Sequence, residues 1–101
     1  MIYVSFLYAD KTGARFDEAY YLNKHLPRVR ELWNARGLVD LTPLVRLKDD
    51  GSAGPFRAIS ILKFSSEAAY NDALAHGGAE LIADVNNFTD IVPAAQLSCE
   101  L

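Results

Sequence analysis

Residues 16–27, which read FDEAYYLNKHLP, are the most informative segment of this 101-residue chain. They predict the start of an amphipathic helix, because Asp17 is a good N-cap whose carboxylate can accept hydrogen bonds from free helical amides. Phe16 and Tyr21 have the spacing of a hydrophobic staple around that cap. Pro27 has no amide proton and crowds the carbonyl four residues earlier, so we expect the helix to bend or break near this proline.

One side of this helix collects its apolar and aromatic residues when positions are placed at 100° intervals. These residues are Tyr21, Leu22, His25, Val29, Leu32 and Trp33. The pattern places His25 on the side that should be buried. Gly37 is expected to end the helix, since glycine adopts the left-handed conformation of a C-terminal cap at no steric cost.

The rest of the chain predicts four strands and a second helix. Runs of β-branched and aromatic residues mark strands over Ile2–Tyr8, Leu41–Leu47, Phe56–Phe64 and Ile91–Cys99. Ser65-Ser66 should cap the second helix, Gly77-Gly78 should interrupt it, and Phe88 should fill the core behind it. Pro43 indicates that the second strand lies at a sheet edge or a bulge. The order β-α-β-β-α-β predicts an α+β, ferredoxin-like fold, with a four-stranded antiparallel sheet and both helices on one face.

The composition indicates a single globular domain that spans residues 1–101. The net charge of −3 gives no electrostatic reason to bind nucleic acid or an anionic membrane. No apolar stretch approaches the roughly 18 residues that a bilayer span requires. The single cysteine, Cys99, cannot form an internal disulfide, which fits a reducing compartment. We therefore expect a cytoplasmic protein.

The first strand is apolar on both faces, which a half-solvated sheet would not be. Ile2, Val4, Phe6 and Tyr8 point to one side, while Tyr3 and Leu7 point to the other. Helices on one face leave the opposite face in need of a cover, and a second copy of the chain would supply it. The expected partner is therefore an identical subunit in a homodimer with facing sheets, and a dimer of dimers is compatible with this arrangement.

His25 is the leading candidate for chemistry, because an imidazole exchanges protons near neutral pH. Tyr21 lies one turn earlier on the same side and could donate to the same small-molecule ligand. Other candidate contacts of that ligand are Tyr3, Ser5, Val29 and Trp33. The alternative is structural: buried histidines often only need a hydrogen-bond partner, and the aromatic and apolar candidates can serve as core residues.

No resident cofactor or metal is expected from the residue pattern. His25 and His76 are the only histidines, and no paired cysteine or histidine motif supplies convergent metal ligands. A haem needs one histidine ligand, so that alternative stays open. Glycines lie in the loop at residues 51–54 between two strands, not at a helix start where a dinucleotide fingerprint would be.

Four short motifs resemble the signature of the EthD family, named for ether degradation. They are Phe16-Asp17, Tyr20-Tyr21, His25-Leu26-Pro27 and Gly37-Leu38, and the segments FSSEA (64–68) and ADVNNFTD (83–90) extend the resemblance. The resemblance covers nearly the whole chain. It implies a dimeric α+β barrel, a superfamily that includes cofactor-independent monooxygenases, polyketide cyclases, muconolactone isomerases and haem-degrading enzymes.

The residues and the resemblance together lead to one main functional hypothesis. It is a cofactor-independent oxidoreductase of the monooxygenase type that acts on a small apolar or aromatic metabolite, with His25 as acid and base in a pocket between the first helix and the sheet. An isomerase or polyketide cyclase would use the same proton transfer. A non-catalytic ligand-binding or accessory dimer in a catabolic pathway is the remaining alternative.

Overall fold

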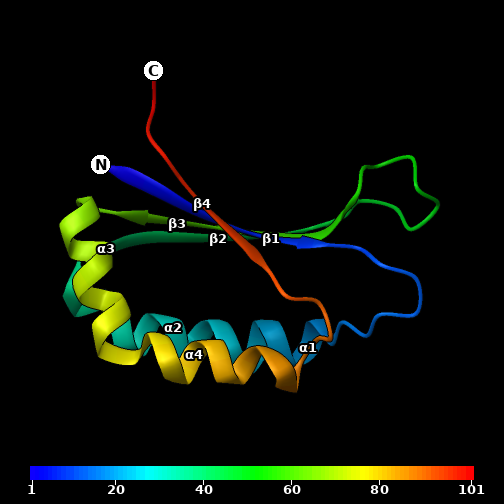
Figure 1. Cartoon of the computed structure of the whole chain (residues 1–101), viewed down its shortest axis with the longest axis horizontal. Coiled ribbons are helices and arrows are strands. Elements are labelled where there is room, and N and C mark those ends of the chain that lie inside the picture. The colour runs from blue at the N-terminus through cyan, green and yellow to red at the C-terminus, as the bar shows by residue number, and fades with distance from the viewer.

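A computed structural model describes residues 1–101 and confirms the β-α-β-β-α-β order. The elements are β1 (Ile2–Ala9), α1 (Glu18–Tyr20), a π-helical turn (Tyr21–His25), α2 (Leu26–Trp33), a 3₁₀ turn (Asn34–Arg36), β2 (Leu38–Val45), β3 (Phe56–Phe64), α3 (Glu67–Ala73), a second π segment (Leu74–Gly78), α4 (Ala79–Asp84), a second 3₁₀ turn (Val85–Asn87) and β4 (Ala94–Ser98). All helices lie on one face of the sheet (Figure 1).

The sheet is antiparallel, with the strand order β2-β3-β1-β4. Pro43 lies on β2, an edge strand, as its missing amide predicts. The starts of two strands differ from expectation by three residues each, and the ends of three strands differ by one or two residues. β2 begins at Leu38 instead of Leu41, and β4 begins only at Ala94. Pro93 has no amide proton for the ladder, and Ile91 is buried in the core outside the strand.

The first helix begins at the predicted N-cap, and its backbone is irregular just before Pro27, where we expected a bend or break. Asp17 is the N-cap and its side chain accepts a hydrogen bond from the amide of Tyr20. The backbone then makes one π turn, in which the amide of Leu26 donates to the carbonyl of Tyr21, five residues earlier. The helix does not break, because the residues around the turn keep right-handed helical dihedral angles. Gly37, at φ 95°, ends the helical segment.

The second helix is interrupted at the predicted glycine pair. Ser66 caps α3 by accepting a hydrogen bond from the amide of Ala69. His76 and Gly77 leave the helical region, and Gly77 adopts a φ of +120°. A Cβ atom at Gly77 would lie 2.9 Å from a methyl carbon of Leu32 on α2. The kink therefore allows the two helices to pack closely.

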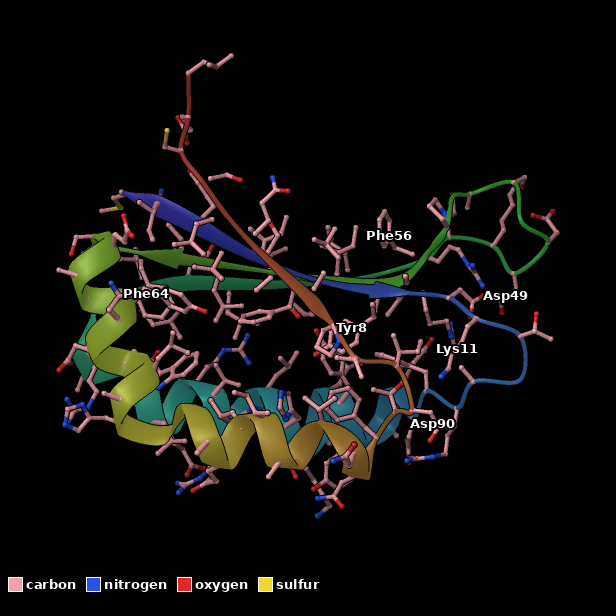
Figure 2. The ribbon with its side chains drawn as sticks, viewed as in Figure 1. Tyr8, Lys11, Asp49, Phe56, Phe64 and Asp90 are labelled. Atoms are coloured by element: carbon pink, nitrogen blue, oxygen red, sulfur yellow. The ribbon has the colours of Figure 1, made fainter.

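The core between helices and sheet contains two groups of aromatic rings. Figure 2 shows Tyr8 and Phe64 between the sheet and the helical layer. Around Tyr8 lie the rings of Phe16, Tyr21 and Phe88 at centroid distances of 5.5, 6.0 and 5.9 Å. Phe64, at 0% exposure, packs with Trp33 and Tyr70 in the other group. Phe88 fills the core as the sequence predicts.

The face of the sheet opposite the helices has no cover within the chain (Figure 1). Strand register assigns its residues, because β3 alternates between buried positions and partly exposed ones. On β1, β2 and β3 this open face includes Tyr3, Ser5, Leu7, Thr42, Leu44, Ile59, Ile61 and Lys63. No helix combines the length and the hydropathy that crossing a membrane requires. The cytoplasmic location stays a prediction.

Candidate functional site

His25 is a buried histidine whose imidazole pairs with a carboxylate. It lies at the end of the π turn and is 6% exposed. Its Nδ1 atom lies 2.9 Å from Oδ2 of Asp84, the last residue of α4. The two helices that cover the sheet therefore contribute one member each. The pair lies between the helices, at the helix face that the sequence predicts to be buried.

Asp84 is held by two further hydrogen bonds. The hydroxyl of Tyr20 donates to Oδ1 at 2.6 Å, and the side-chain amide of Asn87 donates to the same oxygen at 2.8 Å. The Asp84 side chain is 20% exposed, so one edge of it reaches solvent. A carboxylate with donors on both oxygens is fixed in orientation and is stabilised in its ionised form.

The environment shifts both pKa values of the pair downward. Burial would raise the pKa of Asp84, but the hydrogen bonds from Tyr20, Asn87 and His25 outweigh it and hold that pKa below its usual value. Burial lowers the pKa of His25, and the neighbouring Asp84 carboxylate only partly opposes this effect. The resting state at neutral pH is therefore an ionised Asp84 beside a neutral His25.

This protonation state fixes the tautomer of His25. An ionised carboxylate has no proton to give, so Nδ1 of the imidazole carries the proton and donates it to Asp84. The Nε2 atom then carries the lone pair and is the basic atom of the ring. A carboxylate in this position also stabilises the imidazolium that forms after a proton is accepted. The arrangement can act as a general base and then as a general acid.

Aromatic rings fill the space around His25. Its ring centroid lies 4.7 Å from that of Phe88 and 6.0 Å from that of Tyr21. Phe88 and Tyr21 are both 0% exposed. The prediction of an open pocket between the first helix and the sheet is wrong for this closed structure, because large side chains occupy that space. His25 is 6% exposed, so a ligand reaches its imidazole only if neighbouring side chains move.

The cavity next to the pair lies outside the core, between the first helix and α4. It has a volume of about 610 Å³, and its lining includes Tyr20, Asp84 and Asn87 but not His25. Arg28 crosses it and binds both carboxylate oxygens of Glu80 at 2.6 and 2.9 Å. Only two of its ten lining residues are hydrophobic. This polar groove gives Asp84 access to solvent and does not suit an apolar ligand.

Tyr21 and Val29 are buried on the same side of the helix as His25, as the sequence predicts. The Tyr21 hydroxyl hydrogen-bonds the side chain of Ser60 on β3, and no hydrogen bond joins it to His25. Burial raises the pKa of Tyr21, although the bond to Ser60 opposes this shift. Tyr21 therefore orients the helix against the sheet, and its stacked ring forms one wall beside the imidazole.

Tyr3 and Ser5 do not belong to this group. They pair with Lys63 and Ile61 on the open face of the sheet, so the sheet separates them from His25. The Lys63 ammonium lies 5.6 Å from the centroid of the Tyr3 ring, which is an interaction on that outer surface. The expectation that Tyr3 and Ser5 contact the same ligand as His25 is wrong, because alternate residues of a strand point to opposite faces.

Trp33 is a core residue at a different place from His25. It is 3% exposed and packs on Phe64 at a centroid distance of 5.8 Å. It lies eight positions after His25, which corresponds to about 12 Å along a helix. Trp33 is therefore not a neighbour of the imidazole, although its buried indole nitrogen has no hydrogen-bond partner.

Asp84 is the residue that the sequence reasoning missed. Its position before an Asn-Asn pair suggests only a turn or a cap, and Tyr20 suggests only a helix edge. The signal that could have found them is the ADVNNFTD segment, which places a carboxylate and an amide three residues apart at a helix end. Across the whole chain, no three His, Cys, Asp or Glu side chains converge as metal ligands would.

Comparison with known proteins gives structural matches only. No family model and no curated protein matches the sequence. An EthD-like protein from Ralstonia eutropha JMP134 is 33% identical, and the match covers 96% of this chain and 88% of that chain with a TM-score of 0.85. An ethyl tert-butyl ether degradation (EthD) family protein from Bacillus halodurans C-125 is 17% identical over 100% of this chain and 99% of that chain, with a TM-score of 0.77. SnoaB, a cofactor-independent oxygenase from Streptomyces nogalater, is 15% identical over 99% and 91%, with a TM-score of 0.70.

Proposed function

This chain belongs to the EthD-like family, and we propose that it is a homodimeric enzyme that transforms a small apolar or aromatic molecule without a resident cofactor. The observation that carries the proposal is the buried contact of 2.9 Å between Nδ1 of His25 and Oδ2 of Asp84. A carboxylate that orients an imidazole and leaves Nε2 basic is a recurrent arrangement for general acid–base catalysis.

The proposed first step is removal of a proton by Nε2 of His25. The substrate is a carbon acid or phenol, and the proton leaves an acidic C–H or O–H bond while its electron pair stays on the substrate. Asp84 stabilises the resulting imidazolium through the Nδ1–H hydrogen bond. Once neighbouring side chains move to admit a substrate, the rings of Tyr21 and Phe88 would exclude water and suit an aromatic or apolar molecule.

The oxygenation that we favour consumes only the substrate and O₂. The carbanion adds to O₂ and forms a C–OO⁻ group, which takes back the proton from the His25 imidazolium to give C–OOH. Loss of the remaining proton on that carbon, with cleavage of the O–O bond, then releases water. The net change converts a CH₂ group and O₂ into a C=O group and H₂O. The similarity to SnoaB, described as a cofactor-independent oxygenase, supports this outcome over the others. An isomerase or cyclase would use the same proton abstraction and return the proton to a different atom of the same molecule.

The proposed dimer forms when the open faces of two copies pack together. The open face presents Leu7, Leu44, Ile59 and Ile61 without a cover in the chain. A stable interface of this kind commonly buries on the order of 2,000 Å² in total. Sedimentation velocity at micromolar concentration should show a dimer of the 11.2 kDa chain. A monomer at every concentration would contradict this part of the proposal.

The catalytic proposal is tested with a panel of hydroquinones and β-dicarbonyl compounds. Exchange of the acidic C–H in D₂O under argon, followed by NMR, measures proton abstraction without oxygen. Oxygen uptake with an electrode measures the complete reaction. His25→Gln should slow both by roughly 10²–10⁴-fold. Asp84→Asn should give a loss of similar order, because an amide cannot fix the same tautomer or stabilise the imidazolium.

The two measurements separate the alternatives. Exchange without oxygen uptake would favour isomerisation or cyclisation over oxygenation. Binding of a panel compound without exchange or uptake would make the protein a ligand-binding subunit. His76→Gln is the matched control, since His76 is exposed and contacts only its own helix. Equal turnover of the His25→Gln and His76→Gln proteins would show that His25 is structural.

A further inference from the structure

Tyr8 is a buried tyrosine whose hydroxyl has no hydrogen-bond partner in the chain. It lies on β1, between the sheet and the helical layer (Figure 2), and is 2% exposed. The hydroxyl keeps some accessible surface, because the only fully enclosed side-chain atoms without a partner are nitrogens of Trp33 and Arg46. Buried polar groups are usually hydrogen-bonded, so an unpaired hydroxyl in the core requires an explanation.

The other tyrosines show that this is not the general pattern of the chain. Of its five tyrosines, three use their hydroxyls in hydrogen bonds, which join Tyr3 to Glu100, Tyr20 to Asp84 and Tyr21 to Ser60. Only Tyr8 and Tyr70 lack a partner. Tyr70 packs on Phe64, in the aromatic group away from His25. Tyr8 therefore carries the one unpaired tyrosine hydroxyl in the aromatic group that flanks the imidazole.

Tyr8 and His25 have two neighbouring rings in common. The centroid of the Tyr8 ring lies 6.0 Å from that of Tyr21 and 5.9 Å from that of Phe88. The imidazole centroid of His25 lies 6.0 and 4.7 Å from the same two rings. A molecule that takes the place of the Phe88 ring when side chains move would therefore lie against both the imidazole and the phenol. Such a molecule contains about one aromatic ring.

The Tyr8 hydroxyl is suited to act only as a donor. Burial raises the pKa of Tyr8 well above its ordinary value, and the nearby Tyr21 adds to this shift. The phenol therefore keeps its proton at neutral pH and does not compete with His25 for a proton of the substrate. A donor held in a site without water stabilises an oxygen that gains negative charge during a reaction.

We infer that Tyr8 is a second catalytic residue, which donates a hydrogen bond to a carbonyl oxygen of the substrate while His25 removes a proton from the adjacent carbon. The inference rests on the proposed function and narrows its substrate to a carbon acid with the acidic C–H bond next to a carbonyl group. The proton moves from carbon to Nε2 of His25. The electron pair of the C–H bond forms the enolate, whose oxygen accepts the hydrogen bond, and the O–H bond of Tyr8 stays intact.

Tyr8→Phe tests this role, because it removes only the hydroxyl and keeps the ring that packs in the core. The test compound is ethyl benzoylacetate, which has one aromatic ring and an acidic CH₂ group between two carbonyl groups. Tyr8→Phe should lower kcat for exchange of that CH₂ group in D₂O under argon by roughly 10²–10³-fold, the usual effect of losing one oxyanion donor. The pH dependence should keep its shape, since His25 remains the base.

Tyr70→Phe is the matched control, because it also removes a hydroxyl without a partner from a tyrosine that is 5% exposed. It should exchange the compound at the wild-type rate. Neither variant loses a hydrogen bond within the chain, so the urea midpoint should not fall in either. A Tyr8→Phe protein with lowered stability and wild-type kcat would show that Tyr8 is a packing residue only.

Infrared spectroscopy of the bound compound, labelled with ¹³C at its ketone, detects the hydrogen bond directly. The carbonyl stretch should lie at lower frequency in the wild type and Tyr70→Phe than in Tyr8→Phe, because a donated hydrogen bond weakens the C=O bond. Equal frequencies or equal exchange rates in the two variants overturn the role of Tyr8 alone. Oxygen uptake with hydroquinones but no exchange of ethyl benzoylacetate by the wild type also overturns it. A wild type inactive toward both classes of compound overturns the proposed function, and the role of Tyr8 with it.

Discussion

His25 and Asp84 are 59 residues apart in the sequence, yet Nδ1 of one lies 2.9 Å from Oδ2 of the other. Their meeting depends on the irregular first helix and on the kinked second helix, which bring the two segments together over the sheet. Because the two side chains meet only in the folded chain, their pKa values differ between the folded and the unfolded state. The titration of the pair can therefore be followed through protein stability.

Stability should fall below neutral pH because of His25. Burial lowers its folded-state pKa, so the unfolded chain binds the proton more strongly. The free energy of unfolding should therefore be highest above about pH 6.5 and should decrease as the pH drops toward the folded pKa. His25→Gln should flatten this part of the curve, measured by urea unfolding at several pH values. His76→Gln should preserve it, and an unchanged slope in His25→Gln would contradict the prediction.

Asp84 should act in a lower pH window. Its folded-state pKa is depressed, so its stabilisation is complete above the unfolded value near 3.9 and is lost as the pH falls through the folded value. Asp84→Asn should remove stability at neutral pH and show less further loss on acidification than the wild type. The same urea series, extended to acid, measures this. Parallel curves for the two proteins below about pH 4 would refute it.

Tyr21 and Ser60 should be energetically coupled. Their hydroxyls form a buried hydrogen bond between the helix and β3. Tyr21→Phe leaves the Ser60 hydroxyl without a partner and should cost about 1–3 kcal/mol of unfolding free energy. The double variant with Ser60→Ala should recover part of this loss, because both polar groups are then absent. Tyr70→Phe is the control, since the Tyr70 hydroxyl bonds no protein group, and additive single effects would exclude the coupling.

Gly37 should tolerate substitution less well than Gly51. Both have positive φ angles, +95° and +86°, so alanine is strained at either position. A Cβ atom at Gly37 would lie 2.7 Å from Cβ of Ala69, whereas nothing lies within 4 Å at Gly51. Gly37→Ala should therefore lose about 1–3 kcal/mol more than Gly51→Ala in urea unfolding. Equal losses would show that backbone strain alone matters.

Pro27→Ala should have a small effect on stability. A proline in a regular helix interior costs about 3 kcal/mol, but Pro27 lies in the first turn of α2, where a missing amide is tolerated. Alanine would add a donor and also increase the entropy of the unfolded chain, and these effects oppose each other. We expect a change of less than about 1 kcal/mol. A gain near 3 kcal/mol would mean that the π turn does not accommodate the proline.

The sequence predicted those features that depend on neighbouring residues. Asp17 and Ser66 as caps, Gly37 as a helix end and Pro43 on an edge strand are all local consequences of side-chain chemistry. The alternation of side chains along a strand also predicts that Tyr3 and Val4 lie on opposite faces of the sheet, as they do. The error was to group Tyr3 with His25 in spite of that alternation.

The features that were not predictable depend on distant contacts. The ADVNNFTD segment marks Asp84 only as a polar residue at a helix end. Its contacts with His25 and Tyr20 arise only when the helices pack. The filling of the core around His25 could not be predicted locally either, because it depends on the combined volume of rings from several segments, such as that of Phe88. Hydrophobic periodicity indicates which side of a helix is buried, but it does not determine whether a cavity remains there.

The π turn at Tyr21–His25 makes the number of residues in this segment as consequential as their identity. Deleting one residue, even the solvent-facing Lys24, would restore ordinary helical spacing and rotate α1 by about 100° relative to α2. Tyr20 would then turn away from Asp84 although every functional side chain was still present. In an alignment of related sequences, a one-residue gap in this segment therefore indicates that the contacts among Tyr20, His25 and Asp84 are absent. A gap is a stronger indication of this than a single substitution in the segment.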